Sequence, residues 1–459
     1  MEHLTPFDAL FLQAEDADPH ASLMIGGVVV IEGPVPTHRE FLDAVASRLD
    51  AVPHARQVVH GFPFDLGAPV WVDDPYFDIA HHVGRTTLPA LGDEAALDRL
   101  VGHVMDPRLD REHPLWKCWI VEGLPDGRWA ILAKMHRCMA GGLSGARLIE
   151  LLCDYEAGAR VVTIAGPQPK VSTRSLSDVI LEVIDLALSP RRQAAFMARQ
   201  LTSPIRLTRT SLQVIRGLMR YGTDLFAGSS APVLNSHLGR HRAFAAARTS
   251  LDDVRLIRDT FDTTVNDVAL AAIASALPVP VRADEILNAI DNRISIMVPS
   301  LPVEVADPVA RLLAVKNRVS THEFSAGTEA EHAIATLAER WPFAPVAWTV
   351  QMAARLPQRA IVAVGANIPG PTEHRKFLGR RIVEILAVAP ISTGSSLSIS
   401  IFSYAGRLTF GVHTDFGAIP DVGAIAASIE QEIARITEAA RRVQQRRTTG
   451  AKRYEHLTS

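Results

Sequence analysis

The chain has 459 residues, of which 47% are hydrophobic and 21% are charged, and its formal net charge at pH 7 is -3. This is the composition of an ordinary globular protein. The length predicts two domains, because single hydrophobic cores stop growing at roughly 250 to 300 residues. The small net charge gives the whole molecule no attraction to a polyanion, so nucleic acid is not an expected partner.

Cysteine usage and the N-terminal residues indicate the compartment. The three cysteines, Cys118, Cys138 and Cys153, are odd in number and lack CxxC spacing, which argues against a disulfide framework and against a zinc motif. The N-terminus lacks the basic and apolar regions of a signal peptide. Residues 386–406 are uncharged but include an alternation of apolar residues with serine, as in a half-buried strand. We therefore expect a cytoplasmic protein with no metal site and no transmembrane segment.

A strand followed by an amphipathic helix is the repeating unit of the first half of the chain. Residues 23–31 form an apolar run that ends before Pro34, which is typical of a buried strand. Thr37 and Glu40 then have the spacing of a capping box, so a helix should begin there. A second helix is expected to begin near Asp93.

A hairpin should follow that second helix. Residues 119–121 and 129–135 are both apolar, and the Pro-Asp-Gly sequence at 125–127 separates them as a turn. The second strand runs directly into residues 136–142. A third helix, with an apolar face at 148–152, is expected after that segment.

The alternation of strand and helix stops between residues 162 and 248, and this stretch is the expected inter-domain region. It contains a basic surface that could lie on an anionic lipid surface. It could equally be the solvated face of a linker helix. The surface consists of seven arginines with no acidic residue among them: Arg191, Arg192, Arg199, Arg206, Arg209, Arg216 and Arg220.

Strand and helix patterns resume in the last part of the chain. We therefore expect an N-terminal domain at 1–165, a helical, arginine-rich region at 166–245 and a C-terminal domain at 246–459. The elements expected in the last domain are a strand at 246–251, helices at 254–261 and 264–271, a rigid turn at 367–371, a hairpin centred on 404–407, and a helix from 422 to about 444 that is followed by a basic tail.

Residues 136–142 read His-Arg-Cys-Met-Ala-Gly-Gly, and Pro-Leu-Trp precedes them at 114–116. In that frame the segment resembles the His-His-x-x-x-Asp-Gly signature of the bacterial wax ester synthase/diacylglycerol acyltransferase family. Arg137 replaces the second histidine of the signature, and Gly141 replaces its aspartate. The resemblance extends over nearly the whole chain, through Leu4-Thr5-Pro6-Phe7-Asp8, Asn266-Asp267 and Asn367-Ile368-Pro369-Gly370-Pro371.

The resemblance implies an α/β fold of two chloramphenicol-acetyltransferase-like domains, with a tunnel at their interface. It implies an acyl-CoA-dependent O-acyltransferase that uses diacylglycerol or a long-chain alcohol as acceptor and makes triacylglycerol or wax ester. Acyl-CoA would be a cosubstrate, and no permanently bound cofactor is implied. A membrane or lipid-body surface is an expected peripheral partner.

In the family, the second histidine of the signature takes the proton of the acceptor hydroxyl. Arg137 occupies this position, and its guanidinium stays protonated at physiological pH, so it cannot accept a proton. Residues 132–137 are expected to be extended, so His136 and Arg137 should point to opposite faces. His136 is the only adjacent titratable base: either a one-residue slip of the strand turns it to the tunnel, or it is a structural histidine.

Three further residues are candidates for substrate binding. Gly142 retains the glycine of the signature, where a turn needs close backbone approach. The resemblance implies that Asn266 and Asp267 lie near the site, where an amide could donate a hydrogen bond to the developing oxyanion. The same pair could simply cap a helix. The family's aspartate at the position of Gly141 is mainly architectural.

Two other patterns were weighed against these candidates. His81 and His82 form a histidine pair without a following Asp-Gly and are more typical of a strand end. Cys138 follows His136 by two residues, but family-type transfer needs no acyl-enzyme. Three functional interpretations therefore stay open: a slow acyltransferase, a catalytically silent homologue that binds acyl-CoA or neutral lipid, and a structural partner on lipid bodies.

Overall fold

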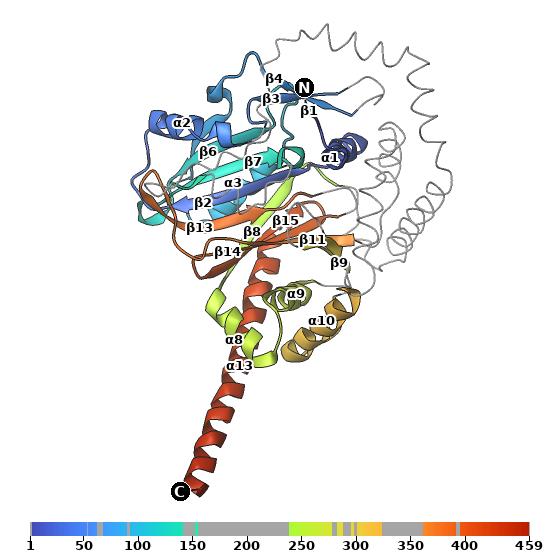
Figure 1. Ribbon diagram of the computed structural model, residues 1–459, viewed down its shortest axis with the longest axis vertical. Coiled ribbons are helices and arrows are strands. Elements are labelled where there is room, and N and C mark those ends of the chain that lie inside the picture. The colour runs from blue at the N-terminus through green and yellow to red at the C-terminus, as the bar shows by residue number, and fades with distance from the viewer. Residues whose placement is uncertain are drawn as a thin grey trace, which may run out of the picture.

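Two six-stranded β-sheets form the frame of the protein (Figure 1). They are seen in a computed structural model that describes residues 2–52, 54–61, 68–89, 92–140, 152–154, 238–277, 282–287, 295–297, 301–323, 361–391 and 395–458. Gly141, Gly142, the seven arginines between 191 and 220 and most of the helix expected at 148–152 lie outside these residues. None of the described helices combines the length and apolar character needed to cross a bilayer.

The first sheet has the strand order β12-β13-β2-β7-β6-β5 and is antiparallel except for the pair β5 and β6. The expected hairpin is confirmed as the antiparallel pair β6 and β7, joined through the 3₁₀ turn Pro125–Gly127. The strands are β2 (Met24–Ile31), β5 (Val83–Thr87), β6 (Trp116–Glu122), β7 (Trp129–His136), β12 (Lys376–Phe377) and β13 (Arg380–Val388).

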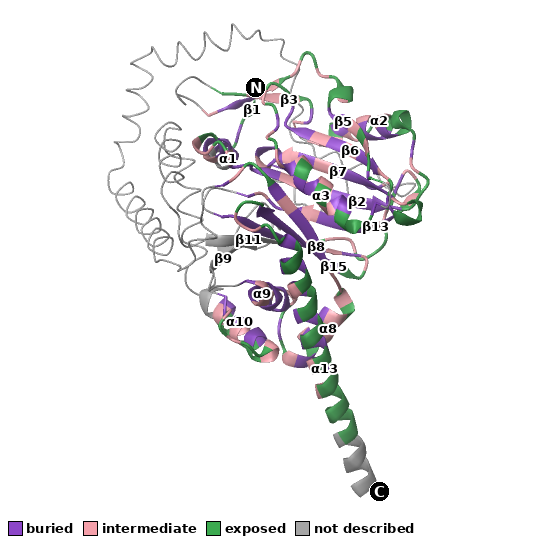
Figure 2. Cartoon of the chain, turned by 180° about the vertical axis from the view of Figure 1, so that it is seen from behind, coloured by how far each residue is buried: buried purple, intermediate pink, exposed green. Residues whose placement is uncertain are grey.

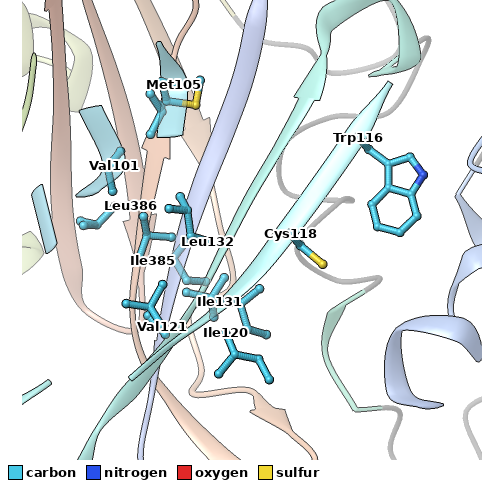
Figure 3. Packing of buried hydrophobic residues seen from close by; sticks show 14 of the residues in the cluster. Val101, Met105, Trp116, Cys118, Ile120, Val121, Ile131, Leu132, Ile385 and Leu386 are labelled. Atoms are coloured by element: carbon cyan, nitrogen blue, oxygen red, sulfur yellow. The ribbon is translucent and has the colours of Figure 1, made fainter. Parts of the chain in front are cut away.

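Local capping begins each helix around this sheet. Helix α1 (Pro6–Ala17) follows the N-cap Thr5, and α2 (His38–Ala46) begins with the Thr37–Glu40 capping box that the sequence predicts. Asp93 caps α3 (Glu94–Met105), whose residues Val101 and Met105 pack with Leu132 and Leu386 (Figure 3). Short 3₁₀ turns also lie at Leu49–Ala51, Ile79–His81 and Arg137–Ala140.

A small sheet with the order β1-β4-β3 holds the start of α1. Its strands are β1 (Glu2–His3), β3 (Gln57–His60) and β4 (Val70–Asp73). Immediately before α1, the Leu4 amide donates a hydrogen bond of 2.8 Å to the Pro69 carbonyl. The start of α1 is therefore tied to this small sheet at the residue that precedes β4.

The second sheet has the order β10-β9-β11-β14-β15-β8 and carries its helices on one side (Figure 1). These helices pack on it in a hydrophobic core of their own. The strands are β8 (Arg242–Ser250), β9 (Arg282–Leu287), β10 (Ser295–Met297), β11 (Ile361–Pro369), β14 (Leu397–Tyr404) and β15 (Arg407–Asp415), and the helices are α8 (Leu251–Phe261), α9 (Val265–Ala276), α10 (Pro308–Glu323) and α13 (Val422–Thr458).

Strand β13 joins the two halves of the chain, because it comes from the C-terminal half and pairs with β2 of the first sheet. Side chains of the second sheet also bond to its carbonyls: Ser400 Oγ donates to Ala387 at 2.5 Å, and Thr409 Oγ1 donates to Ile385 at 2.9 Å. On β8, Phe244 and Ala246 belong to the core of the first sheet, whereas Ala245 and Ala247 belong to the other core. Burial on both faces agrees with the uninterrupted apolar run at residues 243–247 of this strand.

The structure corrects two sequence predictions. Helix α13 continues to Thr458 instead of ending near residue 444, because no proline interrupts the basic segment that follows. It projects beyond the rest of the protein, and its last described side chains are mostly exposed (Figure 2). Asn367 and Pro369 belong to β11, paired with Ile401 and Ser403, and do not form a turn.

Close packing at β13 gives a test of this arrangement. A Cβ at Gly411 would lie 2.0 Å from the Ala387 carbonyl oxygen, whereas a Cβ at Gly61 would meet nothing within 4 Å. We expect Gly411→Ala to lower the free energy of unfolding by about 3 kcal/mol in urea denaturation, because the backbone of β13 must move. Gly61→Ala is the matched control and should change it by less than about 1 kcal/mol. Equal stabilities would contradict the packing of β13 on β15.

Candidate functional site

The end of β7 is fixed on both sides by main-chain hydrogen bonds. The His136 amide donates to the Leu115 carbonyl at 2.9 Å, and the Arg137 amide donates to the Leu23 carbonyl at 2.9 Å. The register between β2 and β7 runs without a shift from Ile31 and Trp129 to Met24 and His136. The strand slip considered for His136 is therefore absent.

His136 is completely buried, and of its two ring nitrogens only Nδ1 has a hydrogen-bond partner among the described residues. The Cys138 amide donates to His136 Nδ1 at 3.2 Å, so the proton of the neutral ring is on Nε2. Nε2 lies 3.6 Å from Glu15 Oε2. In this arrangement neither nitrogen offers a lone pair to an alcohol, and the ring has the environment of a structural histidine.

The Glu15 carboxylate is the centre of a buried cluster. It lies 2.9 Å from Arg111 Nη2 and 3.9 Å from Arg108 Nε, and its Oε1 accepts a hydrogen bond of 3.3 Å from the Leu23 amide. The two guanidinium groups balance its charge. A carboxylate at 3.6 Å would by itself favour the imidazolium form of His136. Burial of the ring, followed by repulsion from Arg111, outweighs this attraction and lowers the pKa of His136 from 6.5 to about 3.

Arg137 is half-buried and lies against the first two turns of α1. Its guanidinium carbon is 5.3 Å from the centroid of the Phe11 ring, an arrangement that favours the cation. Burial lowers the pKa of Arg137, and the Asp8 carboxylate opposes this shift. Asp8 is itself buried, which raises its pKa, while Thr5, Arg137 and His54 each lower it. The charge of Asp8 therefore favours the cationic form of Arg137 at the signature position.

The sequence predicts that His136 and Arg137 lie on opposite faces of an extended strand, and this prediction is wrong. Arg137 is the first residue of a 3₁₀ turn, and the side chains of both residues face helix α1. Asp8 and Glu15 are seven residues apart, or two helical turns, so one face of α1 serves both. Neither Asp8 nor Glu15 was a candidate from the sequence, and the seven-residue spacing of these two acidic residues was the signal that could have found them.

Asn266 and Asp267 lie at the start of α9. This helix belongs to the second lobe, which is the second six-stranded sheet with its helices, whereas the first lobe is built on the first sheet. Asp267 completes a capping box with Thr264: its carboxylate accepts from the Thr264 amide at 2.8 Å, and its own amide donates to Thr264 Oγ1 at 3.0 Å. Asn266 Oδ1 is buried and has no hydrogen-bond partner within the described residues. No hydrogen bond or ion pair between described residues joins either side chain to His136 or Arg137.

The remaining candidates have structural surroundings. His82 is buried, donates a ring hydrogen bond to the Trp116 carbonyl at 2.8 Å, and stacks on Trp116. Burial raises the pKa of the Cys138 thiol, so it stays protonated and unreactive. Within the described part of the chain, no group of three or more histidine, cysteine or acidic side chains could hold a metal ion.

Comparison with known proteins identifies the family. The model of the wax ester synthase/diacylglycerol acyltransferase catalytic domain matches residues 4–269, and the model of the family's C-terminal domain matches residues 290–437. A probable diacylglycerol O-acyltransferase of Mycobacterium tuberculosis is 36% identical to this chain, and the alignment covers 98% of this chain and 99% of that protein. The chain therefore belongs to the wax ester synthase/diacylglycerol acyltransferase family.

Solved structures confirm the α/β fold. The wax ester synthase/diacylglycerol acyltransferase from Marinobacter aquaeolei VT8 superposes with a TM-score of 0.65 at 21% sequence identity, covering 95% of this chain and 99% of that one. Polyketide synthase associated protein 5 from M. tuberculosis gives a TM-score of 0.51 at 16% identity, covering 95% and 98%. The tunnel expected between the lobes and the domain boundaries stay predictions.

The buried imidazole of His136 predicts a dependence of stability on pH. Its pKa is lower in the folded protein than in the unfolded chain, so its contribution to stability is present above pH 6.5 and is lost as the pH falls toward 3. His136→Asn keeps an acceptor near the Cys138 amide and cannot be protonated. Between pH 7 and pH 5, the variant should lose about 2 kcal/mol less unfolding free energy than the wild type. Parallel pH dependences of the two proteins in urea denaturation would contradict a buried neutral His136.

Glu15 and its neighbour Asp16 form a matched pair for testing the buried cluster. The Glu15 side chain is 2% exposed and the Asp16 side chain is 44% exposed, yet both contact Arg111. Glu15→Ala leaves buried donors without an acceptor and should lower the unfolding free energy by about 2 kcal/mol. Asp16→Ala should lower it by less than about 1 kcal/mol. If thermal and urea melts rank the two variants in the opposite order, Glu15 does not hold the cluster together.

Proposed function

We propose that this protein transfers a long-chain acyl group from acyl-CoA to the hydroxyl of diacylglycerol or of a fatty alcohol. The products are triacylglycerol or a wax ester and free coenzyme A. Family membership over nearly the whole chain supports this activity. The observation that carries it is the rigidly held end of β7, where the signature position presents a guanidinium supported by Asp8 and Phe11.

Arg137 has a role in this reaction that differs from proton transfer. The acceptor oxygen attacks the thioester carbonyl carbon, negative charge develops on the carbonyl oxygen, and the carbon–sulfur bond then breaks. A fixed guanidinium can donate hydrogen bonds to that oxyanion and stabilise the transition state. The buried Glu15 cluster fixes His136, and His136 in turn anchors the 3₁₀ turn through the Cys138 amide, so both position Arg137.

Asn266 and Asp267 contribute to substrate binding in this proposal. The Asn266 amide is half-buried, and its buried oxygen is without a partner among the described residues, which suits an amide that awaits a ligand. Asp267 positions it by capping the same helix. Gly142, which retains the glycine of the signature, is the third residue that we assign to substrate binding.

The substrates place the reaction at a lipid surface. Diacylglycerol and fatty alcohols partition into membranes and lipid bodies, whereas acyl-CoA is supplied from the cytoplasm. We propose that the protein works in the cytoplasm as a peripheral protein at such a surface. The seven arginines between Arg191 and Arg220 are the basic stretch that would contact anionic headgroups.

The activity can be tested with purified protein, long-chain acyl-CoA and diacylglycerol. We expect release of free thiol that depends on the acceptor, together with triacylglycerol detected by mass spectrometry. Arg137→Ala should lower kcat by about 100-fold, because loss of one oxyanion donor has an effect of this size. Arg128→Ala, at the β6–β7 turn, is the matched control and should leave kcat unchanged. Wild-type protein that binds acyl-CoA but gives no acceptor-dependent turnover would be a catalytically silent homologue.

A further inference from the structure

We propose that His54 is the general base of this protein, in place of the histidine that the family signature would have at position 137. This inference rests on the proposed acyl transfer. It assigns to His54 the proton chemistry that neither Arg137 nor His136 can perform in the geometry described above.

The turn that carries His54 is anchored to the same strand as the signature. Trp116 Nε1 donates to the Ala55 carbonyl at 2.8 Å, and the Gln57 amide donates to the His54 carbonyl at 3.0 Å. Trp116 follows Leu115, whose carbonyl holds the His136 amide. The His54 turn and the end of β7 are thus both fixed by the start of β6.

Hydrogen bonds set the tautomer of His54. Gln57 Nε2 donates to Asp73 Oδ1 at 2.7 Å, so Gln57 Oε1 is the atom that faces His54. Because this amide oxygen can only accept, His54 Nδ1 must donate across the 2.7 Å that separates them. The lone pair of the neutral ring is therefore on Nε2. Within the described residues Nε2 has no hydrogen-bond partner, and it is available to take a proton.

The imidazole ring is held firmly in place. It stacks on Trp71 with the ring centroids 4.2 Å apart and the planes 8° from parallel. Trp71 pairs with Glu2 in β1, only four residues before α1 begins. The ring therefore lies on the small sheet to which the start of α1 is tied through Leu4 and Pro69.

His54 and Arg137 act on one carboxylate. Both lower the pKa of Asp8, which lies in the first turn of α1 and accepts a hydrogen bond of 2.5 Å from Thr5 Oγ1. These groups come from three separate elements, the turn before β3, helix α1 and the end of β7. Asp73 is also linked to the ring: its carboxylate accepts a hydrogen bond from Gln57, and Gln57 accepts one from His54. The charges of His54 and Arg137 thus both act on Asp8 at the start of α1.

The backbone at His54 is strained in a manner typical of functional sites. Its φ is +59°, in the left-handed region that non-glycine residues rarely adopt. Such residues cost about 1 to 3 kcal/mol each and cluster where side-chain position matters for activity. Asparagine also tolerates this region, so His54→Asn removes the titratable ring without forcing a change of backbone.

The proposed step conserves atoms and charge. His54 Nε2 takes the proton of the acceptor hydroxyl while the hydroxyl oxygen bonds to the thioester carbonyl carbon. Arg137 stabilises the resulting oxyanion. The carbonyl re-forms as the carbon–sulfur bond breaks, and the coenzyme A thiolate takes the proton back from the His54 imidazolium. The base is neutral again, and no other reactant is needed.

Steady-state kinetics of His54→Asn give the main test, with His60→Asn as the matched control because His60 is an exposed histidine at the end of β3. We expect His54→Asn to lower kcat by about 100-fold or more, with little change in KM. His60→Asn should match the wild type.

The outcomes separate this inference from the proposed function. A wild type that turns over, together with a folded His54→Asn variant of equal kcat, overturns the role of His54 and leaves acyl transfer standing. A wild type without turnover overturns both. If His54→Asn does not fold, ¹⁵N NMR of the wild-type ring and the Gln57→Leu variant decide. A ring protonated at Nε2, or a Gln57→Leu variant with unchanged kcat, overturns the inference.

Discussion

The buried carboxylate of Glu15 is the constraint on which the chemistry of this protein depends. It compensates Arg108 and Arg111, accepts a bond from the Leu23 amide and faces the ring of His136. Inside the protein such a charge persists only because it is paired and hydrogen-bonded. By fixing this cluster, Glu15 holds the signature turn in place. Burial keeps the His136 ring neutral and the Cys138 amide takes up its Nδ1 lone pair, so this residue cannot supply the base that Arg137 lacks.

The second constraint is the exchange of β13 between the two halves of the chain. Strand β13 pairs with β2 in the first sheet, and its carbonyls accept hydrogen bonds from side chains of β14 and β15 in the second sheet. This one strand therefore contacts both sheets. Side chains on the two faces of β8 consequently belong to different cores. Interiors packed this closely transmit position from one element to the next. The end of β7 and the start of α9 are therefore held within one packed framework.

Local features were predictable from the sequence, and long-range ones were not. The Thr37–Glu40 capping box, the β6–β7 hairpin and the start of α9 depend on residues within a few positions of each other. The residues before Arg137 are extended, and the sequence predicts the same for Arg137. Instead a 3₁₀ turn begins at Arg137, whose amide donates a hydrogen bond to the Leu23 carbonyl. Asn367 looked like part of a turn, and its pairing with Ile401 makes it a strand residue. The partner of Asn367 lies 34 residues away and that of Arg137 more than 100 residues away, so neither contact can be predicted from neighbouring residues.

The sequence by itself determined the family, the α/β class and the permanent positive charge at position 137, because these follow from residue identity and local order. Tertiary structure alone decided which groups can exchange a proton. The neutral form of His136 depends on burial beside Arg111, the tautomer of His54 depends on Gln57 and Asp73, and Asp8 meets Arg137 through the docking of α1. Desolvation and neighbouring charge set protonation, and both arise only when distant segments come together.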